Sequence, residues 1–166
     1  MMKSALAGLS ILVVASSACA SHKVPHTAPD ESLPHITWEI RTGGEEGEER
    51  IACQSAQPRV ECTLAASSKE RQELATIHLY LHAATQAVTY DGSVRLPFLD
   101  GAADVGRVSA TVTPGSTPQG PTIAGVITSK PGTYTMTVAL KVKHGGNESP
   151  PIDREVKVIV REAAVR

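Results

Sequence analysis

The chain has 166 residues, a formal net charge of −1 and a low aromatic content of 3%. This length suits a short leader followed by one domain with one hydrophobic core. The balance of 16 basic and 17 acidic residues offers no basic surface for nucleic acid, so we expect no nucleic-acid partner.

The first element in the chain is a leader, which we predict over residues 1–18. Lys3 is its only charged side chain, and residues 5–15 form an uninterrupted run of apolar and small residues. A charged start, a short apolar run and then small residues are typical of a secretory signal peptide, here expected as a signal helix. At ~1.5 Å per residue this helix spans about half of a bilayer core, so it is too short for a permanent transmembrane helix.

Two cleavage routes fit the end of this leader. Residues 16–18 are small and Cys19 follows them, which resembles the bacterial lipobox, whose cysteine is lipidated and becomes the new N-terminus. Lipoboxes usually have Leu where this chain has Ser16. The alternative is ordinary cleavage after Ala20, because Ala18 and Ala20 satisfy the A-x-A rule. We favour lipidation, which implies a lipid-anchored cell-envelope protein, preferentially in the outer membrane, whereas cleavage after Ala20 implies a periplasmic one.

Residues 19–34 are expected to form the lipidated N-terminus and a flexible tether. The segment contains three prolines and many polar residues, and its hydrophobic residues have no period. From His35 onward the pattern changes to alternation with a period of two, which is typical of half-buried strands. We therefore predict one domain over residues 35–162.

Several alternating segments follow within this domain, separated by turn-forming residues. Asp91 and Gly92 are predicted to form a type I′ hairpin turn, because both turn positions need a positive φ. The strands are expected near residues 35–41, 51–53, 60–64, 77–82, 88–96, 108–112, 122–128, 133–143 and 156–160.

The ambiguous segment is residues 67–86. Ser68 and the five polar residues after it suit the start of a helix. The strict alternation from Ile77 to His82 suits a strand instead. We predict a strand preceded by a turn or a short helical piece, and a long helix there would overturn the predicted fold.

About eight or nine short strands predict an all-β fold, a β-sandwich, with a barrel as the alternative. Pro131, Gly132 and Thr133 lead to Tyr134 at the start of a long alternating strand, and a valine-rich strand follows. This pattern, over about residues 120–161, resembles bacterial immunoglobulin-like domains. The resemblance implies an antiparallel immunoglobulin-like sandwich and a tyrosine corner, in which the Tyr134 hydroxyl bonds upstream backbone. By analogy it also implies binding or scaffolding in the cell envelope.

Cys53 and Cys62 are predicted to form a structural disulfide. Lipidation or removal of Cys19 leaves them as the only other cysteines in the chain. We expect them on adjacent strands, where facing positions across a ladder fit the ~4.4–6.8 Å Cα separation of a disulfide. The short C-x-x-C spacing of a redox pair is absent, and no second close pair of ligands points to zinc.

His78, Tyr80 and His82 are predicted to share a candidate binding face opposite Ile77, Leu79 and Leu81. Positions four apart on a strand lie about 13–14 Å apart, so the two histidines cannot chelate one ion together. We therefore predict no metal site and no cofactor; a helical segment would bring these histidines closer.

The chain contains no G-x-S-x-G elbow, no H-E-x-x-H and no phosphate-binding glycine loop, so we predict that it is not an enzyme. The expected function is that of a non-catalytic cell-envelope lipoprotein, an interaction or scaffolding module of unknown ligand. Its expected partners are the membrane, through the lipid anchor, and an envelope protein. One alternative, motivated by the six histidines, is a periplasmic metal or small-ligand carrier. The other is a hydrolase whose triad is not visible in the sequence.

Overall fold

The computed structural model describes residues 33–43, 49–56, 60–116 and 120–162. The predicted leader, Cys19 and the tether up to residue 32 lie outside the described residues. The described residues form nine strands and one short 3-10 helix, η1 (Gly101–Asp104). No helix in this part of the chain has the length and apolar character needed to cross a membrane.

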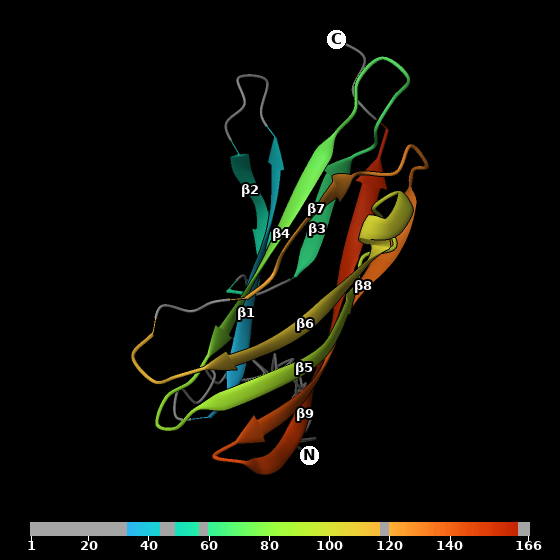
Figure 1. Ribbon diagram of the computed structural model, residues 1–166. Coiled ribbons are helices and arrows are strands. Elements are labelled where there is room, and N and C mark those ends of the chain that lie inside the picture. Colours follow the sequence, from blue (N-terminus) through green and yellow to red (C-terminus); the bar gives the residue numbers. More distant parts are fainter. Residues whose placement is uncertain (1–32, 44–48, 57–59, 117–119, 163–166) are drawn as a thin grey trace, which may run out of the picture.

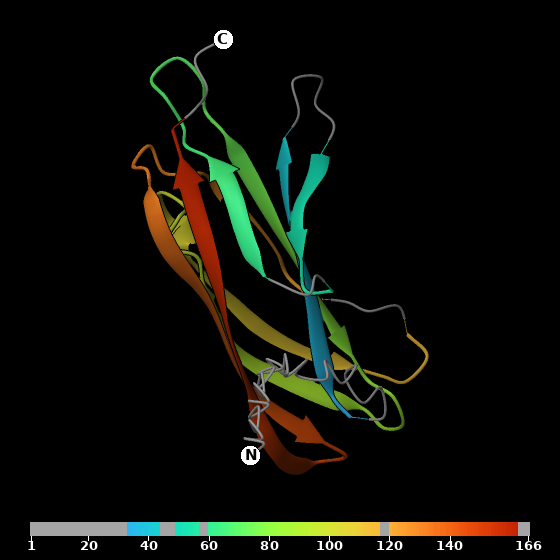
Figure 2. The same ribbon diagram turned by 180° about the vertical axis from the view of Figure 1, so that it is seen from behind.

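The strands form two sheets (Figure 1). The four-stranded sheet has the order β2-β1-β4-β7 and consists of β1 (His35–Gly43), β2 (Glu49–Gln54), β4 (Leu74–His82) and β7 (Thr122–Val126). The five-stranded sheet has the order β3-β9-β8-β5-β6 and consists of β3 (Glu61–Ala65), β9 (Asn147–Arg161), β8 (Gly132–His144), β5 (Val88–Arg95) and β6 (Val105–Val112). Figure 2 shows the two sheets from behind as separate layers, with β3, β8 and β9 in one and β1, β2 and β4 in the other. The prediction of an all-β sandwich is confirmed.

The core lies between the sheets because one face of each strand is apolar. In β4 every second residue is buried, and in β8 the same alternation continues from Met136 to Val142. Side chains from both sheets therefore exclude water from one shared interior. The largest fully buried side chains are Tyr90, Phe98, Ile40, Ile77, Leu81, Leu96, Ile127, Met136 and Leu140.

The strand predicted in the ambiguous segment is confirmed, since β4 begins at Leu74. The polar residues before it form a loop. Its backbone is satisfied locally: Glu73 N–H donates to Ser67 Oγ at 3.0 Å, and Arg71 N–H donates to Ser68 Oγ at 3.1 Å. Serine side chains thus supply acceptors that compete with a helical turn, which explains why the helix-like start does not continue.

The hairpin turn predicted at Asp91 and Gly92 is wrong, because both residues lie inside β5. A two-residue turn there would place Tyr90 and Val94 on opposite faces of a sheet. Both side chains are instead buried on the same face, so the strand continues through Gly92. Glycine is needed at this position because an added Cβ would lie 2.1 Å from the carbonyl oxygen of Ala139 on β8.

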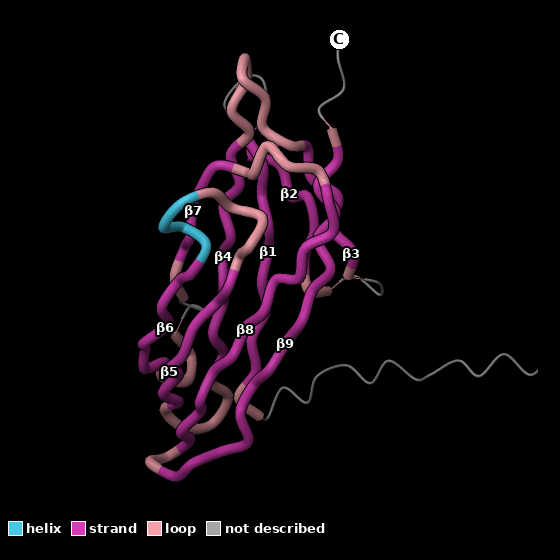
Figure 3. Tube along the Cα trace, turned by 90° about the vertical axis from the view of Figure 1, so that its right-hand side faces the viewer, coloured by secondary structure: helices cyan, strands magenta, loops and turns pink. Residues whose placement is uncertain are grey.

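A tight hairpin turn lies between β8 and β9. Gly145 and Gly146 have positive φ angles of 58° and 85°, as the two central positions of a type I′ turn require. His144 and Asn147 are the strand pair that closes it. Figure 3 shows β8 and β9 side by side along their length.

One strand pair departs from the predicted antiparallel arrangement. β3 runs parallel to β9, from Glu61 opposite Lys157 to Ala65 opposite Arg161. All other described strand pairs are antiparallel. The parallel pair is possible because the long connection through β4 to β8 lets the chain return in the same direction.

Candidate functional site

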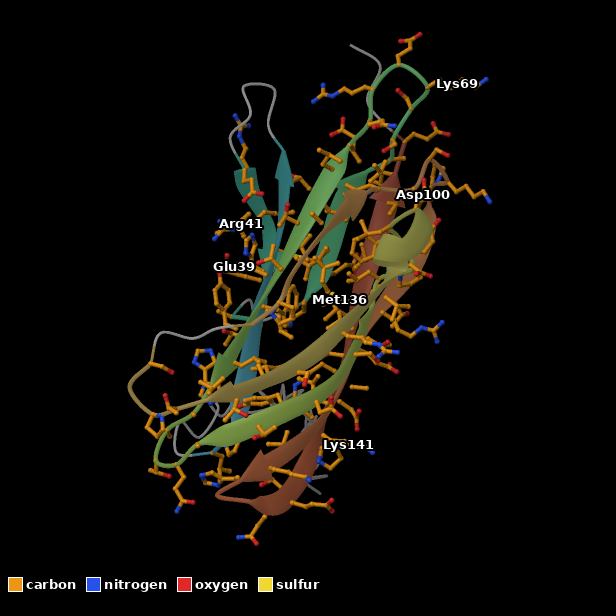
Figure 4. All side chains as sticks on the ribbon, in the orientation of Figure 1. Glu39, Arg41, Lys69, Asp100, Met136 and Lys141 are labelled. Atoms are coloured by element: carbon orange, nitrogen blue, oxygen red, sulfur yellow. A yellow bond between two sulfur atoms is a disulfide. The ribbon has the colours of Figure 1, made fainter. Side chains whose placement is uncertain are left out.

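The outward face of the four-stranded sheet holds the predicted binding residues. His78, Tyr80 and His82 alternate on β4 with buried residues, so they share one face, as predicted. β1 lies beside β4 and adds outward side chains of its own; Glu39 and Arg41 are labelled beside it in Figure 4. The name β1–β4 face is used below for His35, Thr37, Glu39, Arg41, Thr76, His78, Tyr80 and His82.

The strand register decides which of these side chains are neighbours. His82 lies directly opposite His35, and His78 lies directly opposite Glu39. Directly opposed residues have Cβ atoms about 4.5–5.5 Å apart, so each histidine of β4 is closest to a different residue of β1. Within the described ranges, no three His, Cys, Asp or Glu side chains gather closely enough to hold a metal ion.

Glu39 is the acceptor at the centre of the β1–β4 face. Arg41 donates to Glu39 Oε2 through Nε at 3.1 Å and through Nη2 at 2.8 Å. The Tyr80 hydroxyl donates to the same oxygen at 3.3 Å. The hydrogen bond with Glu39 raises the pKa of Arg41 above its ordinary value, so the guanidinium stays charged. Exposed ion pairs contribute little stability, so the main effect of these bonds is to hold the three side chains in a fixed arrangement.

His78 extends this polar network toward both neighbouring strands. Its Nδ1 lies 3.4 Å from Thr122 Oγ1 on β7, and its Nε2 lies 3.8 Å from Glu49 Oε2 on β2. The Nε2 atom is buried and has no hydrogen-bond partner among the described residues. At 3.8 Å the contact with Glu49 is an ion pair only when the imidazole is protonated. The ring also stacks with Tyr80 at a centroid distance of 6.4 Å.

His35 and His82 form a stacked pair at one end of the face. Their ring centroids are 4.4 Å apart and their planes differ by 6°. His82 Nε2 lies 2.9 Å from Thr37 Oγ1, and His35 Nδ1 lies 3.0 Å from the carbonyl oxygen of Leu33. The sequence prediction included His82 and missed His35, because only the pairing of β1 with β4 brings them together.

Tyr90 supports this end of the face from inside the core. It lies on β5 in the opposite sheet and is 0% exposed. Its hydroxyl donates to the carbonyl oxygen of His82 at 2.5 Å and to that of His35 at 3.2 Å. Burial raises the pKa of Tyr90 to about 12, so the hydroxyl remains a donor at neutral pH.

The predicted disulfide between Cys53 and Cys62 is present, with a Cα–Cα distance of 5.6 Å. The expectation that the two cysteines face each other across one ladder is wrong. Cys53 lies on β2 in the four-stranded sheet and Cys62 lies on β3 in the five-stranded sheet. The chain changes sheets between β2 and β3, so the disulfide joins the two layers and both cysteines are buried.

The Tyr134 hydroxyl donates to the carbonyl oxygen of Lys130 at 2.7 Å. This is the upstream backbone bond that the immunoglobulin-like resemblance implied. It fixes the chain where it enters β8, just after the bend at Ser129 and Lys130.

A separate cavity of about 230 Å³ lies on the outer side of the five-stranded sheet. Arg95 and Asp104 bring opposite charges to its wall, and threonine hydroxyls complete the polar part. It belongs to the sheet that does not carry the β1–β4 face. The lining residues are Arg95, Pro97, Asp104, Thr135 and Thr137.

The β1–β4 face therefore combines aromatic rings, a fixed guanidinium and several hydrogen-bond donors and acceptors on adjacent strands. Such side chains can recognise another surface through many contacts made side by side. Compared with known protein families and with curated proteins, the chain matches no family model and no curated sequence.

Proposed function

We propose that the protein is a non-catalytic cell-envelope lipoprotein whose β-sandwich binds a protein partner through the β1–β4 face. The leader over residues 1–18 and the lipobox-like sequence before Cys19 support export and anchoring. The bond between Tyr134 and Lys130 supports an immunoglobulin-like assignment of the sandwich. In this proposal the lipid holds the domain at the membrane and the sheet face meets the partner.

The observation that carries the proposal is the ordered arrangement around Glu39. Arg41 and Tyr80 both donate to one oxygen of Glu39, so an arginine and a tyrosine are held in place before any partner arrives. These two residue types are enriched at protein interfaces. Holding them in advance lowers the entropy lost on binding.

Two exposed apolar side chains lie on the same side of the four-stranded sheet as the β1–β4 face. Ile51 pairs with Arg41 across β1 and β2 and is 51% exposed. Leu74 lies on the outward side of β4 and is 55% exposed. Large apolar side chains beside a polar network are the combination expected of a protein-binding surface. Small-molecule sites are concave, whereas a sheet face presents its side chains side by side, so this face suits a protein partner better than a small molecule.

The test is chemical crosslinking in intact envelopes, followed by purification of the protein with its crosslinked partners. Arg41→Glu reverses the charge beside Glu39, so it disrupts the network and removes the fixed guanidinium. The matched control is Lys141→Glu, an equal charge reversal on an exposed residue of β8 in the other sheet. We expect the wild type and Lys141→Glu to recover the same crosslinked protein and Arg41→Glu to lose it.

Equal recovery by all three proteins, with matching melting temperatures, would refute the β1–β4 face as the binding surface. Recovery of no crosslinked protein by the wild type would refute the interaction role itself. Melting temperatures separate loss of binding from loss of folding.

A further inference from the structure

We propose that the cavity on the outer side of the five-stranded sheet binds a free α-amino acid, with Arg95 holding its carboxylate and Asp104 holding its ammonium group. Both residues line this cavity of about 230 Å³, together with Pro97, Thr135 and Thr137. The cavity belongs to the sheet that does not carry the β1–β4 face. The site therefore does not depend on the proposed protein partner.

The strands β5 and β8 supply the floor of the cavity. Thr135 and Thr137 alternate on β8 with buried residues, so their hydroxyl groups lie on the outer face of the sheet. Arg95 is the last residue of β5 and lies directly opposite Thr137. Directly opposed residues have Cβ atoms about 4.5–5.5 Å apart. The guanidinium and a threonine hydroxyl can therefore reach the same bound group.

The loop that joins β5 to β6 supplies the wall, and its backbone is held in place. Leu96 N–H donates to the carbonyl oxygen of Asp104 at 2.6 Å, which ties the two ends of the loop together. Leu99 N–H donates to the carbonyl oxygen of Leu96 at 2.9 Å. Leu96 and Phe98, on either side of Pro97, are both 0% exposed, so they anchor the loop in the core. Pro97 and Asp104 are thus positioned before a ligand arrives, which lowers the entropy lost on binding.

The cavity brings together opposite charges that do not neutralise each other directly. In the part of the chain that the structure describes, neither Arg95 nor Asp104 forms an ion pair. Arg41 and Glu39 on the other sheet show the contrasting case, since their charged groups are 2.8 Å apart. Arg95 and Asp104 line one cavity without touching, so a ligand with two charged groups can lie between them.

The size and chemistry of the cavity select the ligand. Sites for drug-sized molecules have volumes of roughly 300–1,000 Å³, so this smaller cavity suits a smaller molecule. A guanidinium binds a carboxylate through two parallel hydrogen bonds, and a carboxylate accepts hydrogen bonds from an ammonium group. An α-amino acid carries both groups on one carbon atom. A simple anion would be repelled by Asp104, and a simple cation would be repelled by Arg95.

The test is NMR titration of the whole exported protein with three small probes: glycine, glycinamide, which lacks the carboxylate, and N-acetylglycine, which lacks the ammonium group. We expect glycine to shift the backbone amide signals of Arg95 and Thr137. Glycinamide and N-acetylglycine should each bind at least about ten-fold more weakly.

The test variants are Arg95→Gln and Asp104→Asn, each of which removes one charge and keeps a similar shape. The matched control is Arg107→Gln, because Arg107 is an exposed arginine on the outer side of β6 that does not line the cavity. We expect each test variant to bind glycine at least about ten-fold more weakly than the wild type and Arg107→Gln do. The amide spectrum of each variant without a probe shows whether it is folded.

Glycine that shifted none of these signals in the wild type would overturn the site, as would equal glycine affinity in the wild type and both folded test variants. Equal affinity of the wild type for glycine and N-acetylglycine would also overturn it, because the cavity would then bind an anion without using Asp104. The outcome is separable from that of the crosslinking experiment, which depends on Arg41 in the other sheet and contains no added amino acid.

Discussion

The side-chain hydroxyl of Tyr90, on β5, donates a hydrogen bond to the backbone carbonyl oxygen of His82, on β4 in the opposite sheet. The same hydroxyl also reaches the carbonyl oxygen of His35. A buried polar group of the five-stranded sheet is therefore satisfied by the backbone of the four-stranded sheet. This bond fixes the distance between the layers directly beneath the histidine pair.

Tyr90→Phe should destabilise the protein by roughly 1–3 kcal/mol, because it removes the part-buried hydrogen bonds that the Tyr90 hydroxyl donates to the opposite sheet. The measurement is urea-induced unfolding of the variant and the wild type. Tyr134→Phe is the matched control: it also removes one hydroxyl-to-carbonyl bond, to Lys130, but at an exposed position. If Tyr90→Phe lowers the free energy of unfolding no more than Tyr134→Phe does, the role given to the Tyr90 hydrogen bonds is contradicted.

The stability of the protein should fall as the pH rises from about 10 to about 12. Burial raises the pKa of Tyr90 from 10.0 in the unfolded chain to about 12 in the folded protein. In this interval the unfolded chain loses the Tyr90 proton while the folded protein keeps it, so unfolding releases a proton and becomes more favourable. Urea unfolding at several pH values measures the slope. Tyr90→Phe should show a shallower slope, and an unchanged slope would mean that another group is responsible.

Removing the disulfide with the double substitution Cys53→Ala and Cys62→Ala should lower the free energy of unfolding by about 2.7 kcal/mol in the chain-entropy model, for a closed loop of about ten residues. Alanine avoids placing a hydroxyl at two buried positions. The measurement is guanidinium unfolding with and without a reductant. The wild type should weaken when reduced, whereas the double variant should not respond. If the reductant lowered the stability of the wild type and the double variant equally, loss of the Cys53–Cys62 disulfide would not be the cause.

Gly92→Ala should destabilise the protein by roughly 1–3 kcal/mol, through overpacking between β5 and β8. The added Cβ would lie 2.1 Å from the Ala139 carbonyl oxygen, so the backbone of one strand must move. Gly43→Ala on β1 is the control, because its Cβ would meet no heavy atom within 4 Å. The measurement is the denaturation midpoint of each variant, which should be lower for Gly92→Ala than for Gly43→Ala. Equal midpoints would show that the two strands have room to separate.

Under the proposed lipidation, Cys19→Ser should release the protein from the membrane fraction, because serine cannot form the thioether that the lipid anchor requires. The measurement is fractionation of cells followed by immunoblotting of soluble and membrane fractions. Cys53→Ala with Cys62→Ala serves as the control for loss of other cysteines, and it should remain with the membrane. Unchanged fractionation of Cys19→Ser would refute lipidation, and finding both the wild type and Cys19→Ser in the soluble fraction would favour cleavage after Ala20.

Alternation in the sequence predicts much of the fold because burial on one side of a strand follows directly from a period of two. It identifies β4 and β8 with the correct buried residues, and it separates β4 from the helix-like residues that precede it. Continuity of the pattern could also have rejected the turn at Asp91 and Gly92. Tyr90 and Val94 are an even number of positions apart and both are apolar, whereas a two-residue turn would reverse the faces.

The remaining features depend on contacts between segments that are distant in the chain. Nothing near Cys53 or Cys62 indicates that β2 and β3 belong to different sheets. The pairing of His35 with His82 likewise results from the register of β1 against β4, two strands that do not follow one another in the chain. Local patterns determine which face a residue occupies, but they do not determine its neighbour across the sheet.

The parallel pairing of β3 with β9 has a consequence for the order of folding. Glu61 on β3 forms an ion pair with Lys157 on β9, and the two residues are 96 positions apart in the chain. β3 is an edge strand whose ladder partner is β9, so it has no place in the sheet until almost all of the domain has been synthesised. Pairings of such large sequence separation form slowly, because a long loop must close first. The domain should therefore remain open during synthesis, until β9 is available to pair with β3.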